Sequence, residues 1–203
     1  DVSQKKIYKF KKNNEKKVVI DFSYSLKDYL SFLEVYNYLS KINISIPKIF
    51  EADERQNIII MEDFGDIRYD ELITNFDLKK LLIDAVNTII EIQNFEKPVI
   101  SNIIRQYNFS SFNFEIAEFA DFYIPLKKIG SDKIDEFFYI WKTEFENLNF
   151  DWDSFVHKDY ELSNLMYLPK KKGHLKCGVL DFQNAFIGFS GWDLFSLLEN
   201  PRI

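Results

Sequence analysis

Two short stretches in the last quarter of the chain carry side chains that could perform phosphoryl transfer. His157, Asp159 and Asn164 form the pattern H-x-D-x-x-x-x-N on a predicted loop between two strands, and Asp181 ends an apolar strand. Phosphoryl transfer uses one carboxylate that orients the acceptor hydroxyl and receives its proton, and it uses an amide oxygen and a second carboxylate that hold Mg²⁺ against the phosphates. A hairpin between Asn164 and Asp181 can bring these oxygens together, so the spacing predicts a phosphotransferase site.

Ordinary structural roles are the competing interpretation of the same residues. Asp159 could cap a turn, Asn164 could form an Asx turn, and Asp181 could be a surface acid. Short strands are predicted on both sides of the loop, and an Asp-Phe pair follows Val-Leu at residues 179–182. This context makes a coincidence of three residue types hard to accept, and we favour the catalytic interpretation.

Composition restricts the class of protein. The 203 residues are 46% hydrophobic with only 6 Gly and 5 Pro, which suits one domain, or one built as two small lobes, and excludes disordered and low-complexity chains. The net charge of −6 is a poor match to nucleic acid, and no apolar run reaches the ~20 residues of a membrane span. A single cysteine, Cys177, and the lack of a signal pattern after Asp1 favour the cytoplasm.

The order of the predicted elements indicates an α+β protein. Over residues 1–65 we expect two hairpins and one helix, which begins at the Ser25-x-x-Asp28 capping box, so that a small antiparallel sheet is covered by one helix. From Asp77 onward the apolar spacing becomes mainly helical. The predicted helices cover 77–94, 112–128, 132–148 and a segment from Trp192; the predicted short strands are 154–157, 165–168 and 175–180. The Gly65-Asp66 step is the expected boundary between lobes 1–65 and 66–203.

Several segments resemble a known family. The catalytic loop and the Asp-Phe segment resemble the aminoglycoside phosphotransferase/choline kinase branch of the protein-kinase-like fold. Within it, HKDYELSNLMYLP and GVLDFQNAFIGFSGWDLFSLL are similar to bacterial sugar kinases that phosphorylate the anomeric hydroxyl of N-acetylmuramate and N-acetylglucosamine during cell-wall recycling. The segments DVSQKKIYKF and IIIMEDFGD are also similar to that group. The resemblance implies a two-lobed fold, use of ATP and Mg²⁺, and a small-molecule hydroxyl acceptor such as an amino sugar.

The resemblance also implies roles for individual residues. Asp159 would be the catalytic base, and Asn164 and Asp181 would be the metal ligands. His157 would pack beneath the catalytic loop, and Asp193 would brace that loop through its backbone amides.

The adenine site would lie at the end of residues 1–65. The Glu62 carbonyl and the Phe64 amide would meet the adenine edge, since a backbone acceptor and a donor two residues apart match its amino group and ring nitrogen. An ordinary strand end is the alternative interpretation of this segment.

The chain departs from the protein-kinase pattern at the phosphate site. No glycine precedes Gly65, so a glycine-rich phosphate loop is absent, and Asp21 stands where a strand lysine is usual. We expect Ser3 and a lysine of the first hairpin, Lys6, to face the phosphates instead. Without the strand lysine, Glu34 is expected to be a surface glutamate.

Two further departures concern the acceptor. Asn184 stands where the sugar-kinase group has Asp, and the sequence ends soon after Asp193, so the C-terminal lobe is expected to be truncated. Two alternatives stay open: an aminoglycoside or choline-type phosphotransferase, and a non-catalytic pseudokinase that binds ligands without turnover.

Overall fold

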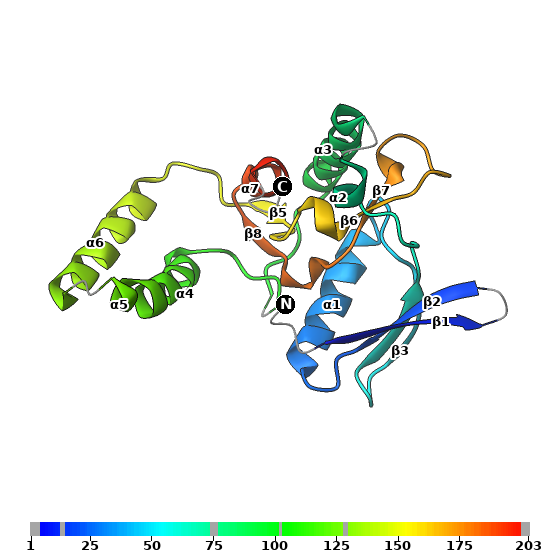
Figure 1. Cartoon of the computed structure of the whole chain (residues 1–203), viewed down its shortest axis with the longest axis horizontal. Coiled ribbons are helices and arrows are strands. Elements are labelled where there is room, and N and C mark those ends of the chain that lie inside the picture. Colours follow the sequence, from blue (N-terminus) through cyan, green and yellow to red (C-terminus); the bar gives the residue numbers. More distant parts are fainter. Residues whose placement is uncertain (1–4, 13–14, 74–76, 102, 128–129, 200–203) are drawn as a thin grey trace.

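The computed structural model describes residues 5–12, 15–73, 77–101, 103–127 and 130–199, and its amino-terminal part is a four-stranded antiparallel sheet (Figure 1). The strand order is β1-β2-β4-β3. The strands are β1 (Lys6–Lys12), β2 (Glu15–Asp21), β3 (Ile49–Asp53) and β4 (Ile58–Glu62). The first pair runs in register from Lys6 opposite Asp21 to Lys12 opposite Glu15, and residues 13–14 between the two strands lie outside the described residues.

A single helix, α1 (Leu26–Leu39), packs on this sheet, and its start is the one that the sequence predicts. The Ser25 hydroxyl accepts the Asp28 amide N–H at 3.2 Å. The Ser25 amide donates to the Phe22 carbonyl at 2.8 Å, so Ser25 closes a turn and caps the helix at the same time. Buried side chains at Tyr29, Phe32, Val35 and Leu39 recur at helical spacing on the face that packs against the sheet.

The remainder of the described chain is mainly helical. Its α-helices are α2 (Tyr69–Leu72), α3 (Leu78–Asn94), α4 (Phe109–Glu118), α5 (Ile124–Leu126), α6 (Ser131–Asn147) and α7 (Trp192–Leu198). The helix predicted over 112–128 is divided by a π-helical turn at Phe119–Tyr123. Helices α4, α5 and α6 form an arm that extends away from the body in Figure 1, and the Phe112 and Phe145 rings, 5.1 Å apart, join α4 to α6.

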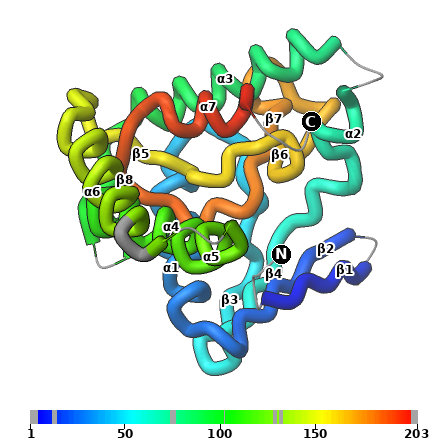
Figure 2. The backbone as a smooth tube through the Cα atoms, turned by 60° about the vertical axis from the view of Figure 1, so that its left-hand side comes forward, coloured from blue at the N-terminus to red at the C-terminus, as the bar shows by residue number. Residues whose placement is uncertain are grey.

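Two short antiparallel pairs of strands lie between the sheet and the helices α3 and α7 (Figure 2). Helices α3 and α7 contact each other on the side away from the sheet. Strand β5 (Ser154–Val156) pairs with β8 (Phe186–Gly188), and β6 (Leu165–Tyr167) pairs with β7 (Cys177–Val179). The sequence predicts β5, β6 and β7 but gives no signal for β8. Three residues are too few to show an alternating pattern, and the partner of β8 lies about thirty residues earlier in the chain.

The main hydrophobic core continues from the sheet into the later part of the chain. Phe22 and Phe32 belong to the same buried cluster as Phe155 and Phe182. The Phe32 ring lies 4.8 Å from the Phe182 ring, which joins α1 directly to the turn that follows β7. The division of the chain at Gly65-Asp66 stays a prediction. None of the helices in the described ranges is long and apolar enough to span a bilayer.

The N-cap of α1 supplies a first test of the fold. Ser25→Ala removes the hydroxyl that accepts the Asp28 N–H, and we expect the free energy of unfolding to fall by about 1 kcal/mol. Urea unfolding followed by circular dichroism measures the change. Ser40→Ala is the matched control, because the Ser40 hydroxyl bonds an exposed carbonyl at the other end of the helix, and it should change stability by less than about 0.5 kcal/mol. Equal effects of the two variants would contradict the capping role.

Candidate active site

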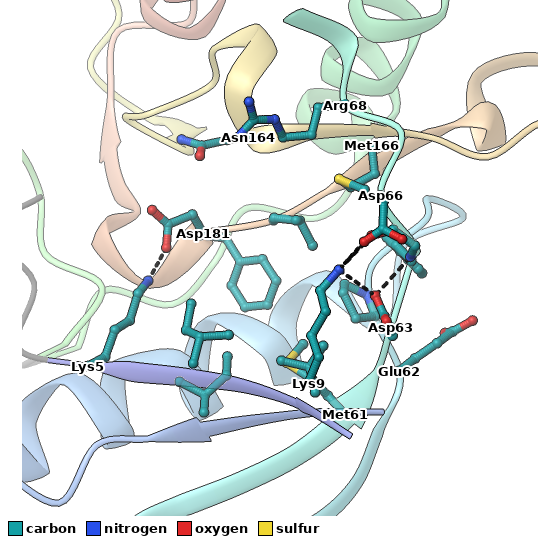
Figure 3. Close-up of a pocket in the computed structure, with 18 of the residues that line it drawn as sticks. Lys5, Lys9, Met61, Glu62, Asp63, Asp66, Arg68, Asn164, Met166 and Asp181 are labelled. Carbon is teal, nitrogen blue, oxygen red and sulfur yellow. Dashed lines mark hydrogen bonds and ion pairs between the residues drawn. The ribbon is translucent and has the colours of Figure 1, made fainter. Parts of the chain in front are cut away.

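A cleft of about 510 Å³ lies between the sheet and the short strands that follow β5 (Figure 3). Strands β1 and β2 line one side, residues 61–66 at the end of β4 and just after it line the back, and residues at the ends of β6 and β7 line the other side. The lining residues include Lys5, Ile7, Lys9, Val18, Ile20, Met61, Glu62, Asp63, Phe64, Asn164, Met166, Leu180 and Asp181. Apolar walls with polar groups at both ends are typical of a small-molecule site.

The pairing of β6 with β7 places Asn164 and Asp181 at the same end of the cleft. Leu165 is opposite Val179, and the Leu180 amide donates to the Asn164 carbonyl at 3.0 Å. Asn164 is therefore the last residue before one strand, and Asp181 comes two residues after the other. Asp181 has φ +61°, a left-handed conformation that non-glycine residues seldom adopt and that turns the chain sharply at this point.

The oxygen atoms at this end of the cleft suit a hard cation. The Asn164 Nδ2 donates to the Asp159 carbonyl at 2.9 Å, which leaves its amide oxygen as the group able to bind a cation. Burial alone would raise the pKa of Asp181, but the Lys5 ammonium and the Gln183 amide outweigh it and hold the pKa below its usual value. One amide oxygen and one ionised carboxylate match the donor set of Mg²⁺ that is shared with a phosphate ligand.

The loop that carries Asp159 is held by a buried carboxylate on α7. Asp193 accepts the His157 amide N–H at 2.8 Å through Oδ2 and the Lys158 amide N–H at 3.1 Å through Oδ1. Burial raises the pKa of Asp193 to about 7, while the two amides favour its ionised form. Lys158 has φ +80°, so the two bonds support a strained turn immediately before Asp159.

His157 connects this loop to the strand end that carries Asp181. Its imidazole is fully buried, and Nε2 bonds the Leu180 carbonyl at 2.9 Å, which requires the proton on Nε2. Burial lowers the pKa of His157 and keeps the ring neutral. The Nδ1 atom is buried without a partner among the described residues. The geometry suits a positioning residue beneath the loop.

Asp159 contacts both the residue before β6 and the turn that follows Asp181. One oxygen of its carboxylate accepts Asn184 Nδ2 at 3.2 Å, and its main-chain carbonyl accepts the Asn164 amide. The structure therefore brings Asp159, Asn164 and the turn after Asp181 into one cluster. Sequence reasoning named Asn184 only as a departure from a family pattern; its bond to Asp159 joins segments 25 residues apart and has no local signal.

The end of β4 and the residues that follow it form the back of the cleft, which Met61, Glu62 and Phe64 all line. Glu62 is fixed to the start of β3, because its amide donates to the Lys48 carbonyl at 2.8 Å and its carboxylate accepts the Lys48 amide at 3.2 Å. The Phe64 ring packs on Gly178 of β7 so closely that a Cβ at position 178 would lie 2.7 Å from two ring carbons. Glycine at 178 thus sets the position of Phe64.

Lys6, the lysine predicted to face the phosphates, is not among the residues that line the cleft. Its Nζ lies 5.2 Å from the centre of the exposed Tyr24 ring. Lys5, which lines the cleft, forms an ion pair with Asp181. Side chains alternate along a strand, so Lys5, Ile7 and Lys9 share the cleft face. That alternation in the sequence could have separated Lys5 from Lys6.

Two other predicted residues are Ser3 and Glu34. Ser3 lies outside the described residues. Glu34, predicted as a surface glutamate, is half-buried, and its carboxylate accepts the Ser101 hydroxyl, which in turn accepts the amides of Ile103 and Ile104. Glu34 therefore fixes α1 to the loop after α3, away from the cleft.

Comparison with known proteins identifies the family. The model of the phosphotransferase enzyme family designated APH matches residues 7–202. The chain belongs to this family. It is 25% identical over 194 residues to the N-acetylmuramate/N-acetylglucosamine kinase of Caulobacter vibrioides, covering 85% of this chain and 50% of that protein. It is 24% identical over 207 residues to the enzyme of the same name from Pseudomonas aeruginosa, covering 100% of this chain and 59% of that protein. The chain thus spans half to three-fifths of these relatives.

Solved structures of aminoglycoside phosphotransferases share the fold. The streptomycin–ATP complex of APH(2")-IIa has a TM-score of 0.63 at 14% identity and covers 94% of this chain and 69% of that one. ADP-bound APH(2'')-Ib has a TM-score of 0.63 at 17% identity, with coverages of 96% and 71%. The predicted α+β, protein-kinase-like fold is confirmed, and the family is one of phosphotransferase enzymes.

The burial of His157 gives a pH-dependent prediction. A histidine ionises near pH 6.5 in the unfolded chain, whereas its pKa in the folded protein is lower. His157 therefore contributes stability fully above pH 6.5, and this contribution falls on acidification, as the unfolded chain takes up a proton that the folded protein does not. His157→Gln lacks this term. We expect the loss of stability caused by the substitution, measured by urea unfolding, to be smaller at pH 5.5 than at pH 7.5.

The control for this comparison is His174→Gln, since the ring of His174 bonds the Asn43 carbonyl at the edge of the fold. The His174 ring is only partly buried, so this substitution should cost less stability than His157→Gln at neutral pH. A destabilisation by His157→Gln that is independent of pH would contradict the assignment of a neutral, buried imidazole.

Proposed function

We propose that this chain is the nucleotide-binding and catalytic part of an ATP- and Mg²⁺-dependent kinase that phosphorylates a hydroxyl of a small molecule. The observation that supports this most directly is that Asn164 and Asp181 line one end of a cleft, while Asp159 contacts Asn164 and Asn184, which lies in the turn after Asp181. The three side chains are those that phosphoryl transfer needs, and they come from two loops that a single hairpin joins.

Asp159 is the proposed catalytic base. Asn184 holds one oxygen of its carboxylate, and the other can accept the proton of an acceptor hydroxyl. The bonds from Asp193 to the backbone of His157 and Lys158 fix the loop before the acceptor arrives. Positioning of this kind is most of what a phosphotransferase must supply, because little covalent chemistry falls to the protein.

Asn164 and Asp181 are the proposed ligands of Mg²⁺. When bound, the ion would neutralise charge on the transferring phosphoryl group. The low pKa of Asp181 keeps its carboxylate ionised at neutral pH, and the bond from Asn164 Nδ2 to the Asp159 carbonyl turns its amide oxygen away from that loop.

The segment Met61–Phe64 is the proposed adenine site. The Glu62 carbonyl and the Phe64 amide offer an acceptor and a donor to the adenine edge, and Met61, Met166 and Leu180 supply apolar contacts in the same cleft. The close fit of Phe64 on Gly178 keeps this segment in one conformation.

The proposed acceptor is an amino sugar, phosphorylated at the anomeric hydroxyl. This proposal depends on the curated relatives, which carry the name N-acetylmuramate/N-acetylglucosamine kinase at 21–25% identity. The cytoplasm is the proposed location, where ATP is available.

The proposed base can be tested by Asp159→Asn. The change keeps the size of the side chain and an oxygen that can accept the Asn184 Nδ2 hydrogen bond, but it removes the carboxylate that accepts the proton. Turnover should therefore fall by a factor of about 10² to 10⁴. Stabilisation by ATP and Mg²⁺ in thermal unfolding should persist, because a ligand that binds the native state raises the melting temperature. Asp151→Asn, at an exposed acid, is the control. Normal turnover of Asp159→Asn would contradict the assignment, and absence of turnover in the wild type despite ATP binding would favour a pseudokinase.

The acceptor can be tested with a substrate panel. N-acetylmuramate, N-acetylglucosamine, choline and kanamycin are compared by kcat/KM for ATP-dependent phosphorylation, with acid lability of the product used to identify an anomeric phosphate. The proposal expects the two amino sugars to be preferred by at least tenfold. Preference for kanamycin or choline would replace the amino-sugar proposal while leaving the kinase chemistry intact.

A further inference from the structure

Lys5 reaches from the start of β1 across the end of the cleft, and its ammonium pairs with Asp181 (Figure 3). The Lys5 side chain is only 8% exposed, whereas the Asp181 side chain is 34% exposed. A lysine this deeply buried is unusual unless a charged partner compensates it. The pair therefore belongs to the interior of the cleft and differs from the exposed ion pairs that Lys16 and Lys97 form elsewhere.

The pair involves one of the two carboxylate oxygens of Asp181 that a metal ion could use. Both the Lys5 ammonium and the Gln183 amide, at 3.0 Å, bond the same Asp181 oxygen, Oδ1. A divalent ion bound through this oxygen would lie next to the ammonium, and two cations at such a distance repel strongly in a partly buried site. Binding of the ion to Oδ1 thus requires Lys5 to move.

A displaced Lys5 ammonium would need another anion, because a buried cation without a partner is costly. The anion that arrives with the metal is the triphosphate. Strand β2, on the same wall, contributes only Val18 and Ile20 to the cleft, so it places no cation there. Lys9, farther along β1, is engaged with Asp63 and Asp66 at the opposite end of the lined surface (Figure 3).

We propose that Lys5 has two positions: in the free protein it is the counterion of Asp181, and in the nucleotide complex it contacts the phosphates. It thereby supplies from β1 the positive charge that β2 does not. This inference rests on the proposed use of ATP and Mg²⁺ and adds a phosphate-binding residue to it.

The two positions have opposite consequences for two ligands. Removal of the ammonium frees Asp181 Oδ1, so a divalent ion alone should bind more tightly. The same change removes a charged donor to phosphate, so ATP without metal should bind more weakly. A residue with a purely structural role would shift both affinities in the same direction or neither.

The experiment measures Mn²⁺ binding without nucleotide by electron paramagnetic resonance, and ATP binding in EDTA by titration calorimetry. Both Lys5→Met and Lys5→Gln remove the ammonium, and the test can be made if at least one of the two variants folds. Lys5→Arg tests whether another cation at this position restores the wild-type affinities. We expect Lys5→Met and Lys5→Gln to weaken ATP binding about tenfold or more and to tighten Mn²⁺ binding several-fold. Lys6→Met, on the opposite face of β1, is the matched control and should leave both affinities at the wild-type values.

Unchanged ATP affinity in the Lys5 variants would overturn the phosphate contact, and unchanged or weaker Mn²⁺ binding would overturn the counterion role. If the wild type bound ATP normally and the variants behaved like it, only this inference would fail. If the wild type bound no ATP at all, the proposed function would fail with it.

Discussion

The register of one short hairpin determines where the chemistry of this cleft can occur. Because Leu165 pairs with Val179, the residue before β6 and the turn after β7 emerge at the same edge, and Asn164 and Asp181 meet there. The bond from the Leu180 amide to the Asn164 carbonyl fixes that register at the strand end. A slip by one residue would turn every side chain of one strand to the opposite face and would separate the two oxygen donors.

Buried polar groups join this hairpin to the loop that carries Asp159 and to α7. His157 spans from the loop to the Leu180 carbonyl, and Asp193 reaches the same loop from α7 with both carboxylate oxygens. Each group is buried and would be costly without its partners. The partners are backbone atoms, so the geometry depends on the path of the chain rather than on further side chains. The site is therefore built as one hydrogen-bonded unit from three segments.

Local signals in the sequence were sufficient for much of this arrangement. Ser25 precedes an apolar helical pattern and caps α1, as the sequence predicts. Asn164 and Asp181 lie at the two ends of a hairpin whose strands the apolar residues between them predict. Features that depend on distant partners were missed. Strand β8 exists because β5 pairs with it, and the Asn184 contact with Asp159 joins separate loops. Lys5 rather than Lys6 lines the cleft because side chains alternate along a strand, a period that the sequence carries but that the prediction of Lys6 did not apply.

Cys177 is the single cysteine of the sequence, and β7 buries it completely beneath Tyr160, whose hydroxyl lies 3.6 Å from its sulfur. Burial raises the pKa of this thiol to about 11, so it is both shielded from reagents and protonated in the folded protein. Modification by a thiol reagent therefore requires β7 to separate from α3 and from the loop that carries Asp159 and Tyr160. The rate of labelling reports how often the very hairpin that carries Asn164 and Asp181 opens, which gives this protein an intrinsic probe of its own local unfolding.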